Sequence, residues 1–324
     1  MLRKIDEAYQ KALSGIVLDK QEIIDLLSVP VGSDECAYLC RKANEAAHVL
    51  THDTAYLWGA IGLDYAPCPK SCDFCSFGAA WHLIKEPKVF TLPEILAQAR
   101  EYVRCGVHFI VLRTTQYYPL ERLCEYVRTI RQEIEGSYEL ILNVGEFNLE
   151  MANRLYESGV NGVYHAIRMR EGTNTRFRVE DRLATLAAVK ESPLKLIHLV
   201  EPLGLEHTSE EIADRFLGAV RYGAYISGVM ARIPVAGTPL GNEPQMSDEL
   251  VAKVIAVLRL SGGDTVQNIC VHPASDMALA SGANVVVIET GAIPRDTDLA
   301  VTKWKHFDCA TAKRLFKSEG YTIG

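Results

Sequence analysis

Ala66-Pro-Cys-Pro-Lys-Ser-Cys-Asp-Phe-Cys-Ser-Phe-Gly78 is the most informative stretch of this 324-residue sequence. It follows a strand-like segment, residues 56–65, and its cysteines Cys68, Cys72 and Cys75 are separated by three and then two residues. Three closely spaced thiolates with no fourth ligand in the run suit a [4Fe-4S] cluster that leaves one iron open to another ligand. Phe74, just before the last cysteine, can cover the edge of such a cluster. The spacing therefore predicts a cluster loop at the C-terminal end of a strand.

Two other interpretations of these cysteines stay open at this point. A zinc loop uses the same residue type, but zinc usually takes four ligands in tetrahedral geometry. Three unrelated core thiols are the other alternative, because free cysteine packs as a small hydrophobic residue. The complete three-cysteine spacing favours the iron-sulfur interpretation over both.

Composition predicts a globular protein of the reducing cytoplasm. The sequence is 48% hydrophobic and 23% charged, with a net charge of -7. No apolar run approaches the roughly 18 residues of a membrane span, and Met1–Glu7 contains no apolar signal core. Nine cysteines in a chain expected not to be secreted indicate metal ligation and reduced thiols. The acidic balance predicts a small-molecule substrate, with no nucleic acid and no membrane as partner.

Strand-like and helix-like segments alternate along the chain after two N-terminal helical segments, 5–13 and 20–27. Apolar residues at spacings of three and four predict the helices, and several begin at cap residues such as Thr208 or Ser247 or end at a glycine such as Gly106. The expected strands are 56–65, 108–113, 138–144, 162–167, 194–200, 227–235, 267–271 and 284–289. The expected helices between them are 92–104, 120–134, 149–157, 179–189, 209–220, 248–260 and 275–280.

This alternation predicts an α/β fold with parallel strands and right-handed crossovers, and its simplest closed form is a single (β/α)8 TIM-type barrel. We expect residues 1–50 to form an N-terminal helical extension and residues 51–324 to form the barrel, with a C-terminal tail helix at 310–318. Barrel enzymes place their chemistry at the C-terminal ends of the strands. The cysteine loop follows the first strand and should therefore lie at that end.

The chain resembles the radical S-adenosylmethionine superfamily, and within it the biotin synthase group, over roughly residues 5–324. Besides the cysteine loop, the resemblance rests on Glu201-Pro-Leu-Gly-Leu-Glu-His-Thr208, Val235-Ala-Gly-Thr-Pro-Leu240, Ser281-Gly-Ala-Asn284 and Arg178-Val-Glu-Asp-Arg-Leu183. The first two segments are moderately specific, and the other two are weak when taken alone.

The resemblance implies a reduced cluster that transfers one electron to S-adenosylmethionine and so yields a 5′-deoxyadenosyl radical. The cofactor performs the difficult step, and the protein orients the substrate and excludes water. The resemblance also assigns roles to residues: Cys68, Cys72 and Cys75 as cluster ligands, Phe74 and the stretch from Glu201 to Glu206 near the adenine, and Arg176 or Arg178 on the cofactor carboxylate.

The chain departs from the best-known biotin synthases in its sulfur source. Those enzymes hold a [2Fe-2S] donor cluster with cysteines from their second, third and fifth strands, where this chain has no cysteine, and with an arginine whose place is near Asn268. We expect another auxiliary iron-sulfur cluster on some of Cys36, Cys40, Cys270 and Cys309. Cys36 and Cys40 are four residues apart and share a helix face. Ordinary buried thiols are the alternative, and packing roles are expected for Cys105 and Cys124.

Three classes of function follow. The first is sulfur insertion at unactivated C-H positions, above all the conversion of dethiobiotin to biotin, with lipoyl synthesis as a close variant. The second is a radical enzyme without sulfur transfer, similar to methylornithine synthase or a hydrogenase maturase, and the third is an iron-sulfur protein without catalysis. A reductant such as flavodoxin or ferredoxin is an expected partner, and a homodimer is left open. The expected substrate contacts are Arg113, Tyr164, Arg168, Arg232 and Asn268.

Overall fold

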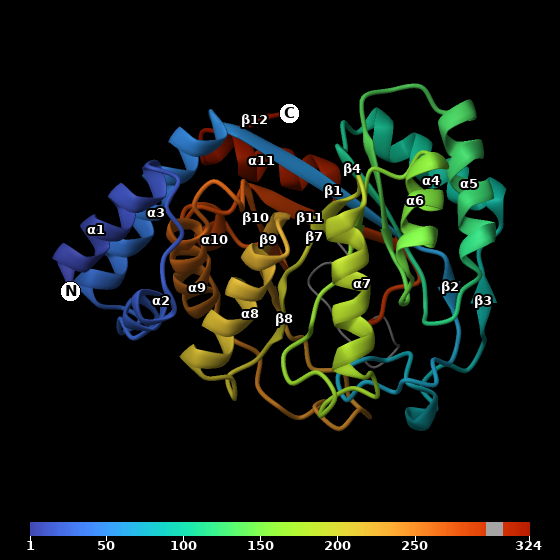
Figure 1. Cartoon of the computed structure of the whole chain (residues 1–324), viewed down its shortest axis with the longest axis horizontal. Coiled ribbons are helices and arrows are strands. Elements are labelled where there is room, and N and C mark those ends of the chain that lie inside the picture. Colours follow the sequence, from blue (N-terminus) through green and yellow to red (C-terminus); the bar gives the residue numbers. More distant parts are fainter. Residues whose placement is uncertain (296–306) are drawn as a thin grey trace.

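A closed barrel of eight parallel strands forms the centre of the computed structural model, which describes residues 1–295 and 307–324 (Figure 1). Strands pair in the order β1-β4-β5-β6-β7-β9-β10-β11, and β11 pairs with β1 to close the barrel. The TIM-type fold predicted from the sequence is confirmed. The barrel strands are β1 (Thr54–Gly62), β4 (Phe109–Arg113), β5 (Glu139–Asn143), β6 (Gly162–Tyr164), β7 (Lys195–Ile197), β9 (Ala224–Ala231), β10 (Asn268–His272) and β11 (Val285–Gly291).

Helices follow the barrel strands and cover the outside of the barrel. The helix start predicted at Thr208 is a capping box, in which the Thr208 hydroxyl accepts a hydrogen bond from the Glu211 N–H and the Glu211 carboxylate accepts one from the Thr208 N–H. The helices are α4 (Leu92–Arg104), α5 (Leu120–Glu133), α6 (Leu149–Glu157), α7 (Val179–Glu191), α8 (Ser209–Arg221), α9 (Asp248–Ser261) and α10 (Asp276–Leu279).

Three N-terminal helices lie beside one flank of the barrel, where the sequence predicted a helical extension. These are α1 (Leu2–Leu13), α2 (Lys20–Leu27) and α3 (Asp34–Thr51), which pack on one another and against α8 and α9 (Figure 1). At the other terminus, α11 (Cys309–Ser318) precedes β12 (Thr322–Ile323), which pairs with the start of β1. The domain boundary at residue 50 stays a prediction. No helix in the described residues is long and apolar enough to cross a membrane.

The first strand ends earlier than the sequence predicted, and this change shapes the cysteine loop. β1 stops at Gly62, where a Cβ atom would lie only 1.8 Å from the Ala292 carbonyl oxygen, so only glycine fits. The next residues form β2 (Asp64–Tyr65), which pairs antiparallel with β3 (Lys88–Val89) and thereby brackets the loop and its short 3-10 helix, Ala79–Trp81. A further strand, β8 (Val200–Leu203), pairs with β9.

The buried hydrophobic residues form two clusters. The larger one fills the layer between the barrel and its helices. The smaller one fills the inside of the barrel with residues such as Trp58, Phe109, Tyr164, Cys270 and Val287. Inward-facing residues become polar towards the C-terminal ends of the strands, as in β11, where Val285 and Val287 are followed by Glu289. The fold thus places polar groups above an apolar floor.

Candidate active site

The cysteine loop is a folded unit at the C-terminal end of β1. The Cys68 carbonyl accepts hydrogen bonds from the Ser71 N–H (3.2 Å) and the Ala79 N–H (2.9 Å), and the Cys72 carbonyl accepts one from the Cys75 N–H (3.0 Å). The Ser76 N–H bonds to the Pro294 carbonyl at 2.9 Å, which ties the loop to the chain after β11. These turns bring Cys68, Cys72 and Cys75 to the lining of one cavity.

The chemistry of these three thiols fits a bound cluster. Burial raises the pKa of Cys72 to about 12 and that of Cys75 to about 11, so the bare loop disfavours thiolates. A bound iron cluster reverses this preference, because a coordinating thiol is deprotonated by the charge of the metal. Within the described ranges, no three His, Cys, Asp or Glu residues lie close enough to hold a single metal ion. A cluster presents several irons, each of which can take one cysteine.

The cavity extends from the three cysteines into the barrel. Its apolar walls include Phe74 and Phe77 from the loop and Trp58, Val111 and Val287 from the strands. Its charged or titratable lining residues besides the cysteines are Asp64, Arg113, Tyr164, Arg168, Arg182, Glu201, Arg232, His272, Glu289 and Arg295. Most of these side chains belong to one of three groups of hydrogen bonds and ion pairs.

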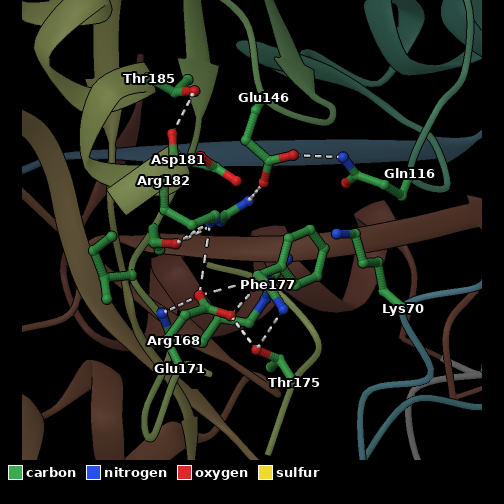
Figure 2. A network of polar contacts seen from close by, with 12 residues as sticks. Lys70, Gln116, Glu146, Arg168, Glu171, Thr175, Phe177, Asp181, Arg182 and Thr185 are labelled. Carbon is green, nitrogen blue, oxygen red and sulfur yellow. Dashed lines mark hydrogen bonds and ion pairs between the residues drawn. The ribbon is translucent and has the colours of Figure 1, made fainter. Parts of the chain in front are cut away.

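The first group surrounds Glu171 (Figure 2). Its carboxylate accepts hydrogen bonds from the Arg168 N–H (2.9 Å) and the Thr175 hydroxyl (2.5 Å), and its Oε2 lies 3.6 Å from Arg182 Nε. Burial alone would raise the pKa of Glu171, but the charges of Arg168 and Arg182 outweigh burial and lower it. The Phe177 ring lies near both guanidinium groups, at 4.8 and 5.2 Å from its centroid.

Arg182 links this group to the end of β5. Its guanidinium donates to the Ala166 carbonyl and, at 3.2 Å, to the Glu146 carboxylate, which also accepts from Gln116 (Figure 2). Arg182 is 3% exposed, and burial lowers its pKa to about 10. Two carboxylates and a carbonyl thus hold one buried guanidinium across two strand ends.

The second group surrounds Glu289 at the end of β11. Arg113 donates from Nη1 to Glu289 Oε1 and from Nη2 to the Ala292 carbonyl, both at 2.6 Å. Arg295 also pairs with the Glu289 carboxylate, and His272 Nε2 lies 3.1 Å from Glu289 Oε2. Burial opposes ionisation, yet the charges of Arg295, His272 and Arg113 hold the Glu289 pKa well below its usual value. Burial lowers the pKa of His272.

The third group is the pair Tyr164 and Glu201, in which the phenol donates to the carboxylate. Both side chains are buried and line the cavity. Burial raises the pKa of Glu201 to about 8, against a smaller lowering by the charge of Arg295. The Trp58 ring meets the Tyr164 ring edge-on, with centroids 5.3 Å apart. Within the described residues, Trp58 Nε1 is buried and has no hydrogen-bond partner.

Most of the residues singled out in the sequence come together at this cavity. The three cysteines, Phe74, Arg113, Tyr164, Arg168, Glu201 and Arg232 all line it. Glu206 lies beside it and pairs with Arg232. Arg176 pairs with Asp73 of the cysteine loop at 3.5 Å. Arg178 does not line the cavity: its side chain is 74% exposed and faces Glu180 and Asp181.

Asn268 lies at the opposite end of the barrel, which corrects its expected place near the substrate. It is the first residue of β10, and its side-chain oxygen accepts a 2.7 Å hydrogen bond from Asn284, which also donates to the carbonyl of Thr54 at the start of β1. Parallel strands begin at one end and finish at the other, so a residue that begins β10 is remote from the mouth. Its hydrogen bond joins the beginnings of the strands.

The four cysteines considered for an auxiliary cluster occupy three different places, and they do not converge within the described chain. Cys36 and Cys40 are neighbours on α3, beside Ser281 and Lys253. Cys309 begins α11 and neighbours Cys105, the cap of α4. Cys270 is fully buried inside the barrel. Their separation follows from the topology, because β10 is a barrel strand, whereas α3 and α11 are two separate helices outside the barrel.

Several cavity residues were missed in the sequence. Trp58 and Glu289 are inward-facing positions of β1 and β11, and alternation along those strands was the available signal. Arg182 stands four residues after Arg178 in the quoted helix start, and only the structure shows that its side chain turns inward. Gln116 and Arg295 lie in loops and Asp64 begins the two-residue strand β2, and no local pattern marked them.

No family model matches the chain. Among curated proteins, "Biotin synthase 2" of Corynebacterium diphtheriae is 24% identical over 268 residues, 80% of this chain and 79% of that protein. "Biotin synthase" of Rippkaea orientalis is 25% identical over 326 residues, 92% of this chain and 87% of that protein. Each covers most of the barrel.

Solved structures give the same architecture. The crystal structure of methylornithine synthase (PylB) superposes with a TM-score of 0.80 at 19% identity, covering 98% of this chain and 97% of that one. HydG, a maturase of the [FeFe]-hydrogenase, also gives a TM-score of 0.80, at 13% identity, covering 100% of this chain and 76% of that one. Together with the three-cysteine loop at the barrel mouth, the similarity to proteins named biotin synthase supports a biotin synthase-like protein of the radical S-adenosylmethionine superfamily, and the solved structures share its fold.

Proposed function

We propose that this radical S-adenosylmethionine enzyme removes a hydrogen atom from an unactivated carbon of a small substrate held inside the barrel. The observation that supports this most directly is that the three loop cysteines and the polar barrel residues line one continuous cavity. The relatives imply a [4Fe-4S] cluster and S-adenosylmethionine, and when bound these supply the one-electron cleavage that yields a carbon radical. Cys68, Cys72 and Cys75 would hold the cluster.

The chain's own residues would position the cofactor and the substrate and exclude water. Arg168 is the guanidinium whose charge acts on both Cys72 and Cys75, so it is suited to an anionic group bound beside the cluster. Phe74 offers an apolar face for the adenine. Trp58, Val111 and Val287 form apolar walls, which restrict water near a reactive carbon.

Sulfur insertion, as in the relatives named biotin synthase, is the finer proposal that the sequence similarity favours. It requires a sulfur donor near the substrate carbon. The donor would need cysteines within reach of the cavity, and Cys270 is the one cysteine among the described residues of the barrel interior. An auxiliary cluster would therefore need ligands besides Cys270.

A radical rearrangement without sulfur transfer is the second candidate. The composition of the barrel interior favours it, because one buried thiol cannot hold an iron-sulfur cluster of the usual four-cysteine kind. The two candidates differ in the iron that they require.

The test is iron analysis followed by turnover of the anaerobically reconstituted protein. About four irons per chain is the content of a single [4Fe-4S] cluster, and sulfur insertion would need iron beyond it. Dethiobiotin and an octanoylated carrier protein would then be supplied with S-adenosylmethionine and a flavodoxin or ferredoxin reductant. A thioether or thiol product supports sulfur insertion. About four irons and no sulfur-containing product would exclude it and leave the rearrangement.

A further inference from the structure

Glu201 is a buried carboxyl group in the cavity that has no cationic partner. It is 7% exposed, and Tyr164 is the one side chain within the described residues that hydrogen bonds to it. No arginine, lysine or histidine of residues 1–295 or 307–324 forms an ion pair with it. Arg295 acts on it only through its charge and pairs with Glu289 instead.

The other carboxylates of the cavity are satisfied by the protein itself. Glu289 has Arg113, Arg295 and His272 around it. Asp64 accepts hydrogen bonds from both the N–H and the hydroxyl of Thr115. A buried carboxylate without such partners is costly, and it is either protonated or paired with a cation from outside the protein. The raised pKa of Glu201 expresses the same cost.

The surroundings of Glu201 suit an ammonium group. Tyr164 and Trp58 meet edge-on beside it and both line the cavity. Aromatic faces attract organic cations, and tryptophan is the strongest of them. Trp58 Nε1 is buried and has no hydrogen-bond partner in the described residues. A buried carboxyl beside two aromatic rings that line the cavity forms a recognition site for an amine-bearing group.

We propose that Glu201, with Trp58 and Tyr164, binds a positively charged amino group of the substrate, so that the substrate belongs to the amines. The inference rests on the proposed radical function only in calling this ligand a substrate. Binding brings the missing cation to Glu201, and the ammonium donates to the carboxylate that Tyr164 already orients. Dethiobiotin has no cationic group and would leave Glu201 unpaired.

The test compares two matched probes, 6-aminohexanoate and 6-hydroxyhexanoate, which differ in an ammonium and a hydroxyl at the same chain position. Their binding to the anaerobically reconstituted protein with S-adenosylmethionine present would be measured by equilibrium dialysis. Because a hydrogen bond between charged groups is stronger than a neutral one, the wild type should prefer the amine by about tenfold or more. Equal binding of the two probes by the wild type would overturn the proposal without any variant.

Two variants test whether Glu201 causes the preference for the amine probe. Glu201→Gln keeps the shape but removes the charge, and the preference for the amine should disappear while 6-hydroxyhexanoate binds as before. Glu180→Gln makes the same change at an exposed glutamate of α7 outside the cavity and should keep the preference. A preference that survives Glu201→Gln would overturn the assignment to Glu201. Because binding is measured without turnover, a protein that forms no 5′-deoxyadenosine but still prefers the amine would contradict the proposed radical function alone.

Discussion

Glu171 and Glu201 are two glutamates at the same barrel mouth, and their surroundings are opposite in charge pairing. Glu171 has two guanidinium groups, a hydroxyl and an N–H around it, and its pKa is lowered. Glu201 has one phenol, and its pKa is raised to about 8. The first carboxylate is a counter-ion that fixes the positions of Arg168 and Arg182. The second is left open toward the cavity, which is the arrangement expected of a group that binds a ligand.

The largest expected effect on stability comes from removing an arginine that pairs with Glu171. In Arg182→Met, Glu171 and Glu146 each lose a buried cation. Removing one partner of a buried ion pair costs about 3–5 kcal/mol, and we expect the free energy of unfolding to fall by this amount in anaerobic urea titrations. Arg178→Met is the matched control, because its exposed side chain should change stability by less than about 0.5 kcal/mol. A similar, small loss for both variants would show that the network does not stabilise the fold.

Because the Glu201 carboxyl has no cationic partner, replacing it should stabilise the protein by an amount that depends on pH. In the unfolded chain Glu201 ionises near its ordinary pKa of 4.5, whereas in the folded protein it ionises near 8. The folded state therefore loses stability as pH rises from 4.5 to 8, and the loss is constant above 8. Glu201→Gln removes this penalty.

We expect that variant to match the wild type at pH 4 and to be more stable by about 4 kcal/mol at pH 8, since the pKa of Glu201 rises from 4.5 to about 8 and each pKa unit corresponds to about 1.4 kcal/mol. Thermal unfolding of both proteins across this pH range measures the difference. A variant less stable than the wild type at pH 8 would mean that the Glu201 carboxylate has a stabilising partner.

The smallest effect is expected for an exposed pair. Asp73 of the cysteine loop pairs with Arg176, whose side chain is 53% exposed. Water screens such a pair, so Arg176→Ala should lower the free energy of unfolding by about 0.2–1 kcal/mol. A loss of unfolding free energy as large as that for Arg182→Met would show that ion pairs at the barrel mouth contribute equally whether they are buried or exposed.

The sequence predicted the barrel and the cysteine loop because both are written in local patterns. Apolar periodicity marked the strands, and three cysteines in eight residues marked the loop. The carboxylates and guanidiniums of the cavity could not be paired in this way. Glu289 and Arg113 are 176 residues apart and meet only because β11 and β4 both pair with β1.

Asn268 shows the same limit from the other side. The sequence predicts a substrate contact for Asn268, but this residue begins β10 and lies at the far end of the barrel. The two ends of a five-residue strand are close in sequence, but they lie at opposite ends of the barrel, and only one of these ends holds the cavity. Which end a residue occupies depends on where the strand starts, and periodicity does not fix strand boundaries to one residue.

The most direct test of the central claim is the formation of 5′-deoxyadenosine. The reconstituted protein, S-adenosylmethionine and dithionite would be incubated anaerobically, and the product measured by liquid chromatography and mass spectrometry. We predict product from the wild type and from Cys124→Ser, a buried cysteine on α5 outside the cavity, and none above background from Cys72→Ser. Product from Cys72→Ser at the wild-type level, or no product from the wild type with its cluster intact, would contradict the account.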